Sequence, residues 1–309
     1  MTDYPKIVFL GTPAFAVATL RALTENGFRV VAVVTAPDKP AGRGLKMTES
    51  AVKQFALQKH IPVLQPEKLK SQEFLDMLKS YQADLQVVVA FRMLPELVWA
   101  MPPMGTINLH GSLLPQYRGA APINRAIMNG EKKTGVTTFK LQQEIDTGNI
   151  LLMEEISIGP SETAGQLHDR MMEVGAQLVV QTIRGLVDGT LEEKPQPMMN
   201  PSDLKTAPKI FKTDAEIIWT DPILRIYDQI RGLSPFPGAY TDFHHKTLKI
   251  YRARPEKEDH DKHPGLTETD GKTWMRFAGM DGYIYVEELQ LEGKNKMEIA
   301  DFLRGYRSL

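Results

Sequence analysis

The sequence contains no cysteine, which excludes disulfides, thiolate nucleophiles and cysteine-bound metals. Its seven histidines form no HExxH or HxxxH pair, and we expect no metal. No GxSxG motif marks an activated serine, and the GxGxxG turn of nicotinamide and flavin sites is missing. No apolar run approaches the roughly 20 residues that span a bilayer, and the N-terminus shows no leader pattern. We therefore expect a soluble, cytoplasmic protein with no membrane partner.

A strong net charge is also missing. The 37 lysines and arginines nearly balance the 38 acidic residues, for a net charge of −1. A nucleic-acid partner would have to bind a local basic patch, because no global positive field would attract it. The length of 309 residues suggests two domains, at about 150 residues per domain.

The N-terminal half predicts an α/β fold. Continuous apolar strands at 6–11, 29–36 and 83–91 alternate with helices expected at 48–59 and 71–81. Strands without polar alternation are typical of a parallel sheet covered on both faces, so we predict a Rossmann-like domain. Thr12 is expected to N-cap the first helix, with Pro13 at its first position.

A second domain is predicted after a proline-rich break. Thr163 and Gln166 form a capping box for a long helix that closes at Gly189, and prolines then recur up to Pro208. Short strands at 239–243, 247–252, 274–277 and 284–291 follow, which suggests a small β-barrel. The predicted domains are therefore 1–188 and 209–309, joined by a linker at 189–208.

Chemistry concentrates in the stretch TINLHGSLLPQYRGAAP at 106–122. Strand alternation puts Asn108 and His110 on one face, at the strand's C-terminal end, which is where open α/β sheets bind ligands. Asp146 lies in the turn of a hairpin predicted between 134–141 and 150–158. Together these residues offer an amide donor, a base and a carboxylate, which suits acyl transfer to an amine without a covalent intermediate. A lone His–Asp pair is more often structural, so the trio is a hypothesis.

The segment PDKPAGRGLK at 37–46 holds three basic residues against one acid. Its prolines and glycines predict irregular structure. Composition alone favours an ordinary solvated surface loop over a basic arm that contacts phosphates.

The motifs NLHGSLLPQYRGAAPI and EIDTGNI closely resemble the signature of methionyl-tRNA formyltransferases, within the 10-formyltetrahydrofolate-dependent formyltransferase family. FLGTPAFA, PDKPAGRG, TGVTTF and LSPFPGAY extend the resemblance over nearly the whole chain. The Asn-x-His and Asp set belongs to the wider family, whereas RGAAPI, PAGRG and the C-terminal region point to its tRNA-specific branch.

The resemblance implies a Rossmann-like catalytic domain, an OB-like C-terminal tRNA-binding barrel and formyl transfer from 10-formyltetrahydrofolate to the α-amine of initiator methionyl-tRNA. Asn108 would polarise the formyl carbonyl, His110 would shuttle protons, and Asp146 would orient His110. The folate site would be lined by Ser112, Leu113, Leu114 and Pro115. Arg43 and Lys46 would contact the tRNA acceptor end, which favours the basic-arm interpretation of their loop. We expect a monomer.

One departure from the family pattern is Phe91-Arg92-Met93, where many members have a small glycine after the aromatic residue. Because this strand end should lie near the pterin, Arg92 bears on the contacts of the folate pocket.

Two alternatives keep the same trio: a formyltransferase acting on an amino-sugar nucleotide, and a formyltetrahydrofolate hydrolase. A catalytically silent tRNA- or folate-binding protein is a third possibility, although it would need no such trio.

Overall fold

The computed structural model describes residues 4–41 and 46–305, which form two compact units. Unit 1 comprises residues up to Gly119 together with Gly135–Ile156 and His168–Lys205. Unit 2 comprises Ala120–Thr134, Ser157–Leu167 and the chain from Thr206 onward. Within the described ranges, no helix combines the length and the apolar character needed to cross a membrane.

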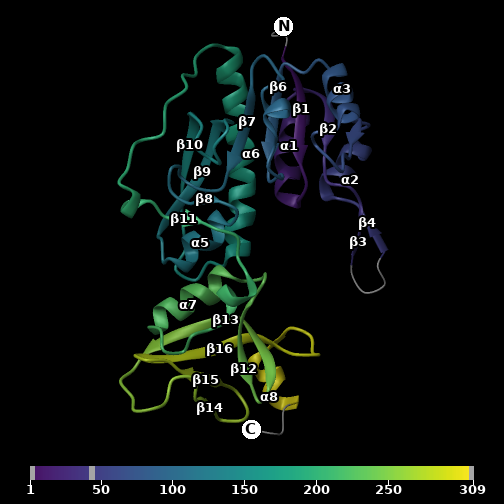
Figure 1. Cartoon of the computed structure of the whole chain (residues 1–309). Helices are drawn as coiled ribbons and strands as arrows, with labels where there is room; N and C mark the ends of the chain where they lie inside the picture. The colour runs from purple at the N-terminus through teal and green to yellow at the C-terminus, as the bar shows by residue number, and fades with distance from the viewer. Residues whose placement is uncertain (1–3, 42–45, 306–309) are drawn as a thin grey trace. The chain divides into compact units, whose positions relative to one another are not determined.

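A seven-stranded sheet of order β10-β9-β7-β6-β1-β2-β5 is the framework of unit 1, counting the described residues (Figure 1). The pairs β1–β2, β1–β6, β6–β7 and β2–β5 are parallel, whereas β7–β9 is antiparallel. The predicted Rossmann-like α/β class is confirmed. The strands are β1 (Lys6–Gly11), β2 (Arg29–Val34), β5 (Val63–Leu64), β6 (Leu85–Val89), β7 (Thr106–His110), β9 (Lys133–Lys140) and β10 (Ile150–Ser157).

Helices cover both faces of this sheet, as its apolar strands require. On one face, Val8 and Leu10 of β1 share a core cluster with Phe74 and Leu78 of α3. On the opposite face, α6 approaches β7 so closely that a Cβ at Gly175 would lie 2.7 Å from Leu109 Cδ2. The helices are α1 (Ala14–Glu25), α2 (Ala51–Gln58), α3 (Gln72–Ser80), α4 (Glu96–Trp99) and α6 (Ala164–Val187).

Two helix starts test the predicted caps. The capping box is confirmed, since Thr163 N donates to Gln166 Oε1 at 2.9 Å and Gln166 N donates to Thr163 Oγ1 at 3.3 Å. The prediction for Thr12 is wrong, because Pro13 occupies the N-cap with extended angles (φ −80°, ψ 176°) and helix α1 begins at Ala14.

The basic loop is more regular than predicted. Strands β3 (Lys39–Ala41) and β4 (Lys46–Thr48) pair antiparallel, so the expectation of irregular structure is wrong at these residues. Proline is compatible with an isolated two-stranded ribbon because its missing N–H can face solvent there.

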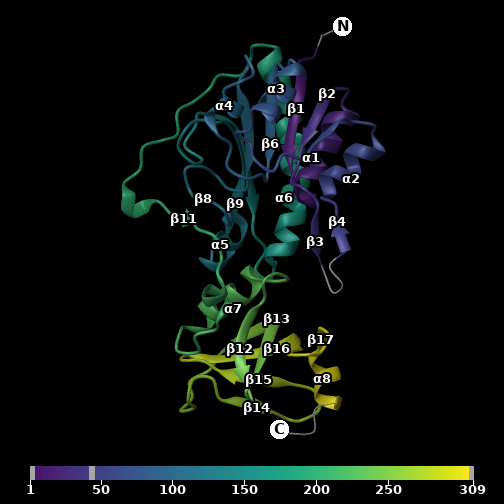
Figure 2. The same ribbon diagram turned by 45° about the vertical axis from the view of Figure 1, so that its right-hand side comes forward.

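Unit 2 contains an antiparallel sheet of order β12-β13-β16-β15-β14, with β17 paired to β16, that curls into a half-barrel (Figure 2). Ile223, Ile226 and Ile230 of α7 belong to one hydrophobic core cluster together with buried residues of this sheet. The elements are α5 (Pro122–Met128), α7 (Ile223–Gly232), β12 (Ala239–Phe243), β13 (Lys246–Lys257), β14 (Thr267–Thr269), β15 (Met275–Ala278), β16 (Gly282–Leu291), β17 (Met297–Glu298) and α8 (Ile299–Gly305). Short elements elsewhere are β8 (Arg118–Gly119), β11 (Thr206–Ala207) and 3₁₀ turns at Pro201–Asp203 and Lys212–Ala215.

Candidate active site

The carboxyl ends of β1, β6 and β7 lie at one edge of the parallel sheet, because the three strands run in the same direction. The chain order reverses between β1 and β6, and such switch points are where α/β sheets bind ligands. Asn108 and His110 lie at this edge on β7, two residues apart and therefore on the same face. Asn108 is half-buried, and His110 is only 6% exposed.

His110 is held by a main-chain carbonyl. Its Nε2 lies 2.8 Å from Tyr117 O. A carbonyl oxygen can only accept, so Nε2 carries the proton, and in the neutral ring Nδ1 is left with its lone pair. Nδ1 lies 3.7 Å from Asp146 Oδ2, beyond hydrogen-bond distance. Tyr117, rather than Asp146, therefore fixes the tautomer of His110.

Asp146 lies in the turn between β9 and β10 and is 9% exposed. Its backbone adopts φ +54°, which is uncommon for a residue with a side chain. Its Oδ2 accepts a hydrogen bond from Gly119 N at 2.9 Å. The turn itself requires Gly148, since a Cβ there would lie 1.7 Å from Lys140 O. The structure thus brings His110 and Asp146 together from 36 residues apart (146 − 110).

The four residues predicted to line a folate site form a turn directly after β7. Ser112, Leu114 and Pro115 are buried, whereas Leu113 is half-buried. Thr137 Oγ1 ties the turn to β9, because it donates to Ser112 O at 2.6 Å and accepts from Leu114 N at 3.2 Å. Of the four side chains, only that of Leu113 offers partly exposed surface to a ligand.

The base of the basic loop is anchored, although its tip is not described. Lys53 Nζ lies 2.5 Å from Asp38 Oδ2, and Gln65 Nε2 donates to Asp38 Oδ1 at 2.7 Å. Lys53 and then Gln65 hold the pKa of the Asp38 carboxyl below its usual range. Arg43 lies outside the described residues, and Lys46 is described only as the first backbone position of β4.

The departure at Arg92 has a local explanation. Its guanidinium donates to the carbonyl oxygens of Pro66 and, at 2.9 Å, of Glu67. Arg92 therefore holds the segment that follows β5.

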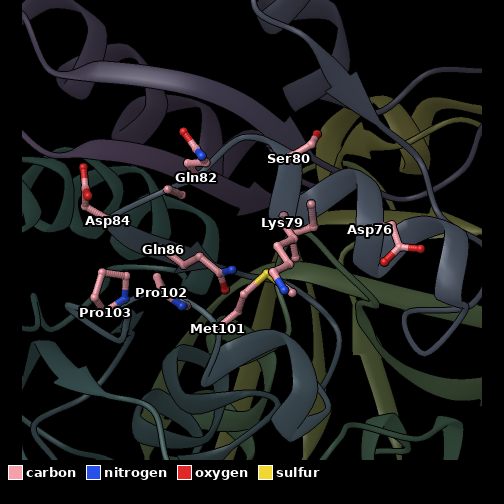
Figure 3. Close-up of a pocket in the computed structure, with 11 residues that line it drawn as sticks. Asp76, Lys79, Ser80, Gln82, Asp84, Gln86, Met101, Pro102 and Pro103 are labelled. Atoms are coloured by element: carbon pink, nitrogen blue, oxygen red, sulfur yellow. The ribbon is translucent and has the colours of Figure 1, made fainter.

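A hollow of about 610 Å³ opens at the opposite edge of the sheet, before the starts of β6 and β7 (Figure 3). Gln86, at the start of β6, lines it together with residues of the loops that precede both strands. It contains none of the predicted site residues. Its other lining residues are Asp76, Leu78, Lys79, Ser80, Gln82, Ala83, Asp84, Met101, Pro102 and Pro103.

Tyr117 and Gly119 are site residues that the sequence did not single out for catalysis. Both act through main-chain groups, a carbonyl toward His110 and an N–H toward Asp146. Side-chain identity carries no signal for such contacts. The only hint was their place in the QYRGAAP segment.

Comparison with known proteins covers both halves of the chain. A family model described as formyl transferase matches residues 5–183, and one described as formyl transferase, C-terminal domain, matches residues 209–307. A methionyl-tRNA formyltransferase of Bacteroides fragilis is 48% identical over 307 residues, covering 97% of this chain and 95% of that protein. The one from Parabacteroides distasonis is 49% identical over 312 residues, covering 98% and 96%.

Solved structures share the fold at lower identity. The sugar 3N-formyl transferase WlaRD matches with a TM-score of 0.68 at 19% identity, covering 95% of this chain and all of its own. HypX from Aquifex aeolicus, in complex with tetrahydrofolic acid, matches with a TM-score of 0.67 at 18% identity. That match covers 97% of this chain and 47% of HypX.

Proposed function

The chain belongs to the formyl transferase family, and from this premise we propose that it transfers a formyl group from 10-formyltetrahydrofolate to the α-amino group of initiator methionyl-tRNA. The observation that carries the proposal is the 48–49% identity to methionyl-tRNA formyltransferases along nearly the full length of both proteins. The likeness to a sugar formyltransferase at 19% identity supports a common fold but not a sugar acceptor.

In the proposed reaction, the neutral methionyl amine attacks the formyl carbon. The C–N bond forms while the carbonyl electron pair moves onto oxygen, and the Asn108 amide stabilises that oxyanion by donating a hydrogen bond. His110 Nδ1 takes the proton that the amine loses. When the intermediate collapses, the bond from carbon to N10 of the folate breaks, and His110 returns the proton to N10.

The geometry around His110 supports these roles. With Nε2–H bonded to Tyr117 O, the free lone pair is on Nδ1, on the side of Asp146. Once Nδ1 is protonated, the ring is a cation 3.7 Å from a carboxylate oxygen. The side chains of His110 and Asp146 are only 7% and 11% exposed, and such an attraction is screened less there than in water. In the proposal Asp146 therefore stabilises the charge of His110, while Tyr117 orients it.

The remaining assignments follow the same proposal. Residues 112–115 form the wall of the folate site, with Leu113 as its exposed side chain. Arg43 and Lys46, on the loop anchored by Asp38 and Lys53, contact the tRNA acceptor end. The catalytic domain is 1–188, the linker is 189–208, and residues 209–309 bind tRNA. The enzyme acts as a monomer in the cytoplasm, where translation begins.

The proposal is tested by incubating the full chain with 10-formyltetrahydrofolate and charged initiator methionyl-tRNA. We expect N-formylmethionyl-tRNA and tetrahydrofolate in equal amounts, with no product from free methionine or uncharged tRNA.

A parallel reaction offers an amino-sugar nucleotide, and another offers water alone as the acceptor. Folate turnover in either, without formylated tRNA, would contradict the proposed acceptor while leaving the formyl-transfer chemistry in place.

A further inference from the structure

Gln196 lies within the segment predicted to be a linker, yet its side chain bonds the turn that carries Asp146. Its Nε2 donates to Asp146 O at 2.8 Å and to Gly148 O at 2.9 Å. Residues 192–195 and 197–199 are exposed, whereas Gln196 is half-buried. One side chain in an otherwise solvated stretch is therefore turned inward, onto the turn next to the site.

Arg118 fixes the orientation of this amide. Its Nη2 and Nε donate to Gln196 Oε1 at 2.6 and 3.2 Å. A guanidinium can only donate and the two turn carbonyls can only accept. Reversing the Gln196 amide would break all four bonds, so a single orientation satisfies every partner.

These contacts close a ring around Asp146. Gly119, the residue after Arg118, donates its N–H to Asp146 Oδ2 at 2.9 Å. The main chain of Asp146 is thus held by Gln196 and its carboxylate by Gly119, while Arg118 joins the two. Asp146 needs such support because its φ of +54° is costly for a non-glycine residue.

The backbone around Gln196 is conformationally restricted before its side chain binds the turn. Pro195 and Pro197 flank it, and each restricts φ to about −65°. Two residues earlier, Lys194 pairs with Ile150 by hydrogen bonds of 2.7 and 2.9 Å. An already extended segment loses little conformational entropy when Gln196 binds the turn.

We propose that Gln196, oriented by Arg118, is a positioning residue that sets the Asp146 carboxylate against His110. The inference rests on the proposed function, because it assigns Asp146 a part in formyl transfer. Gln196 touches no reacting atom and acts only through Asp146. A displacement of about 1 Å in such a group can cost about 100-fold in rate.

The test compares Gln196→Met, Asp146→Asn and the double variant in the full chain. Methionine keeps the length of the side chain but removes the donors and the acceptor. We expect Gln196→Met to lower kcat about 10- to 100-fold with both KM values changed less than about 3-fold. The double variant should match Asp146→Asn within about 2-fold, because a residue acting through Asp146 has nothing left to position. If the kcat loss of the double variant instead equals the product of the two single-variant losses, the inference is overturned.

A second measurement needs no turnover. Hydrogen exchange of the Gly119 amide, followed by NMR, should speed up at least about 10-fold in Gln196→Met, because its acceptor on Asp146 is no longer held. Unchanged exchange would overturn the inference. If the wild-type protein formylates no tRNA, the proposed function fails, and the exchange rate still decides whether Gln196 holds Asp146.

Gln229→Met is the matched control. The Gln229 amide also donates to two main-chain carbonyls, Asp214 O and Glu216 O, both at 2.9 Å, but it lies in unit 2. We expect it to leave the Gly119 exchange rate unchanged. If Gln229→Met speeds this exchange as much as Gln196→Met does, the effect does not depend on the contacts of Gln196, and the inference is overturned.

Discussion

At the scale of single residues, main-chain atoms define much of this site. The Tyr117 carbonyl fixes which nitrogen of His110 is free, and the Gly119 N–H holds the Asp146 carboxylate. The arrangement differs from a hydrolase triad, in which a carboxylate accepts from the imidazole Nδ1–H. Here Nδ1 faces the carboxylate with a lone pair, so the pair gains its attraction when His110 takes up a proton.

His110→Ala is expected to lower kcat for tRNA formylation by about 10²- to 10⁴-fold, the range that general acid–base groups contribute. Folding should survive, because the change costs only the bond to Tyr117 and some packing, about 1–3 kcal/mol. Steady-state kinetics and a thermal melt check both parts.

His168→Ala is the matched control, since His168 Nδ1 also lies near a carboxylate, 3.0 Å from Asp169 Oδ1, on helix α6. It should retain wild-type turnover. Near-normal turnover in His110→Ala would remove that residue from the mechanism.

At the scale of elements, the turn between β14 and β15 shows how one side chain can organise a hairpin. Asp270 Oδ1 accepts from the backbone N–H groups of Lys272, Thr273 and Trp274 at 2.9, 2.7 and 3.0 Å. The Thr273 hydroxyl, followed by these N–H groups, holds the pKa of the Asp270 carboxyl well below its usual range. The carboxylate form therefore stabilises the turn.

Asp270→Asn should lower the Tm at pH 7 by about 1–3 °C, as expected for loss of a capping interaction. A carboxyl whose pKa is lower in the folded state stabilises above its unfolded-state pKa of about 3.9, and that stability is lost as the pH falls toward the folded-state value. The difference in Tm between wild type and variant should therefore shrink below about pH 4. Melts from pH 3 to pH 7 measure it, and a constant difference would contradict the assigned cause.

Elements also show what the sequence could and could not predict. The buried strands were predictable because continuous apolar runs leave few alternatives, and Asn108 and His110 followed from alternation along one such strand. The cap at Thr12 failed because Pro13 is itself extended. The contacts of Gln196 lie 48 and 50 residues away along the chain, and no local pattern encodes such pairs.

At the scale of the whole molecule, charge is distributed unevenly although the net charge is −1. Residues 37–46 carry three basic residues against one acid, and the ion pair between Asp38 and Lys53 anchors the base of this segment. In the proposed function, this is the local basic patch that a protein without a global positive field needs in order to bind tRNA.

Binding of tRNA should therefore weaken as salt rises, because phosphate contacts release counterions. Arg43→Ala should raise the KM for methionyl-tRNA and leave the KM for the folate donor unchanged. The slope of the logarithm of the tRNA binding constant against the logarithm of the salt concentration should become smaller in magnitude by about one. Arg29→Ala is the control, since Arg29 is exposed at the opposite, amino end of β2. If Arg43→Ala instead raises the KM values of both substrates equally, the loop has a structural role and does not bind tRNA.

The division of the chain has a consequence for its synthesis. Helix α5 leaves the ribosome about 100 residues before α7, yet Asn124 Nδ2 donates to Gly232 O at 2.8 Å. Likewise, the Gly159 and Glu162 carbonyls accept from Arg231, which is only 3% exposed. A nascent chain that ends before residue 206 can finish unit 1 but leaves two of its own segments without the surface they pack on. The second unit is thus assembled from segments that are synthesised at three separate times, the last of which begins at Thr206.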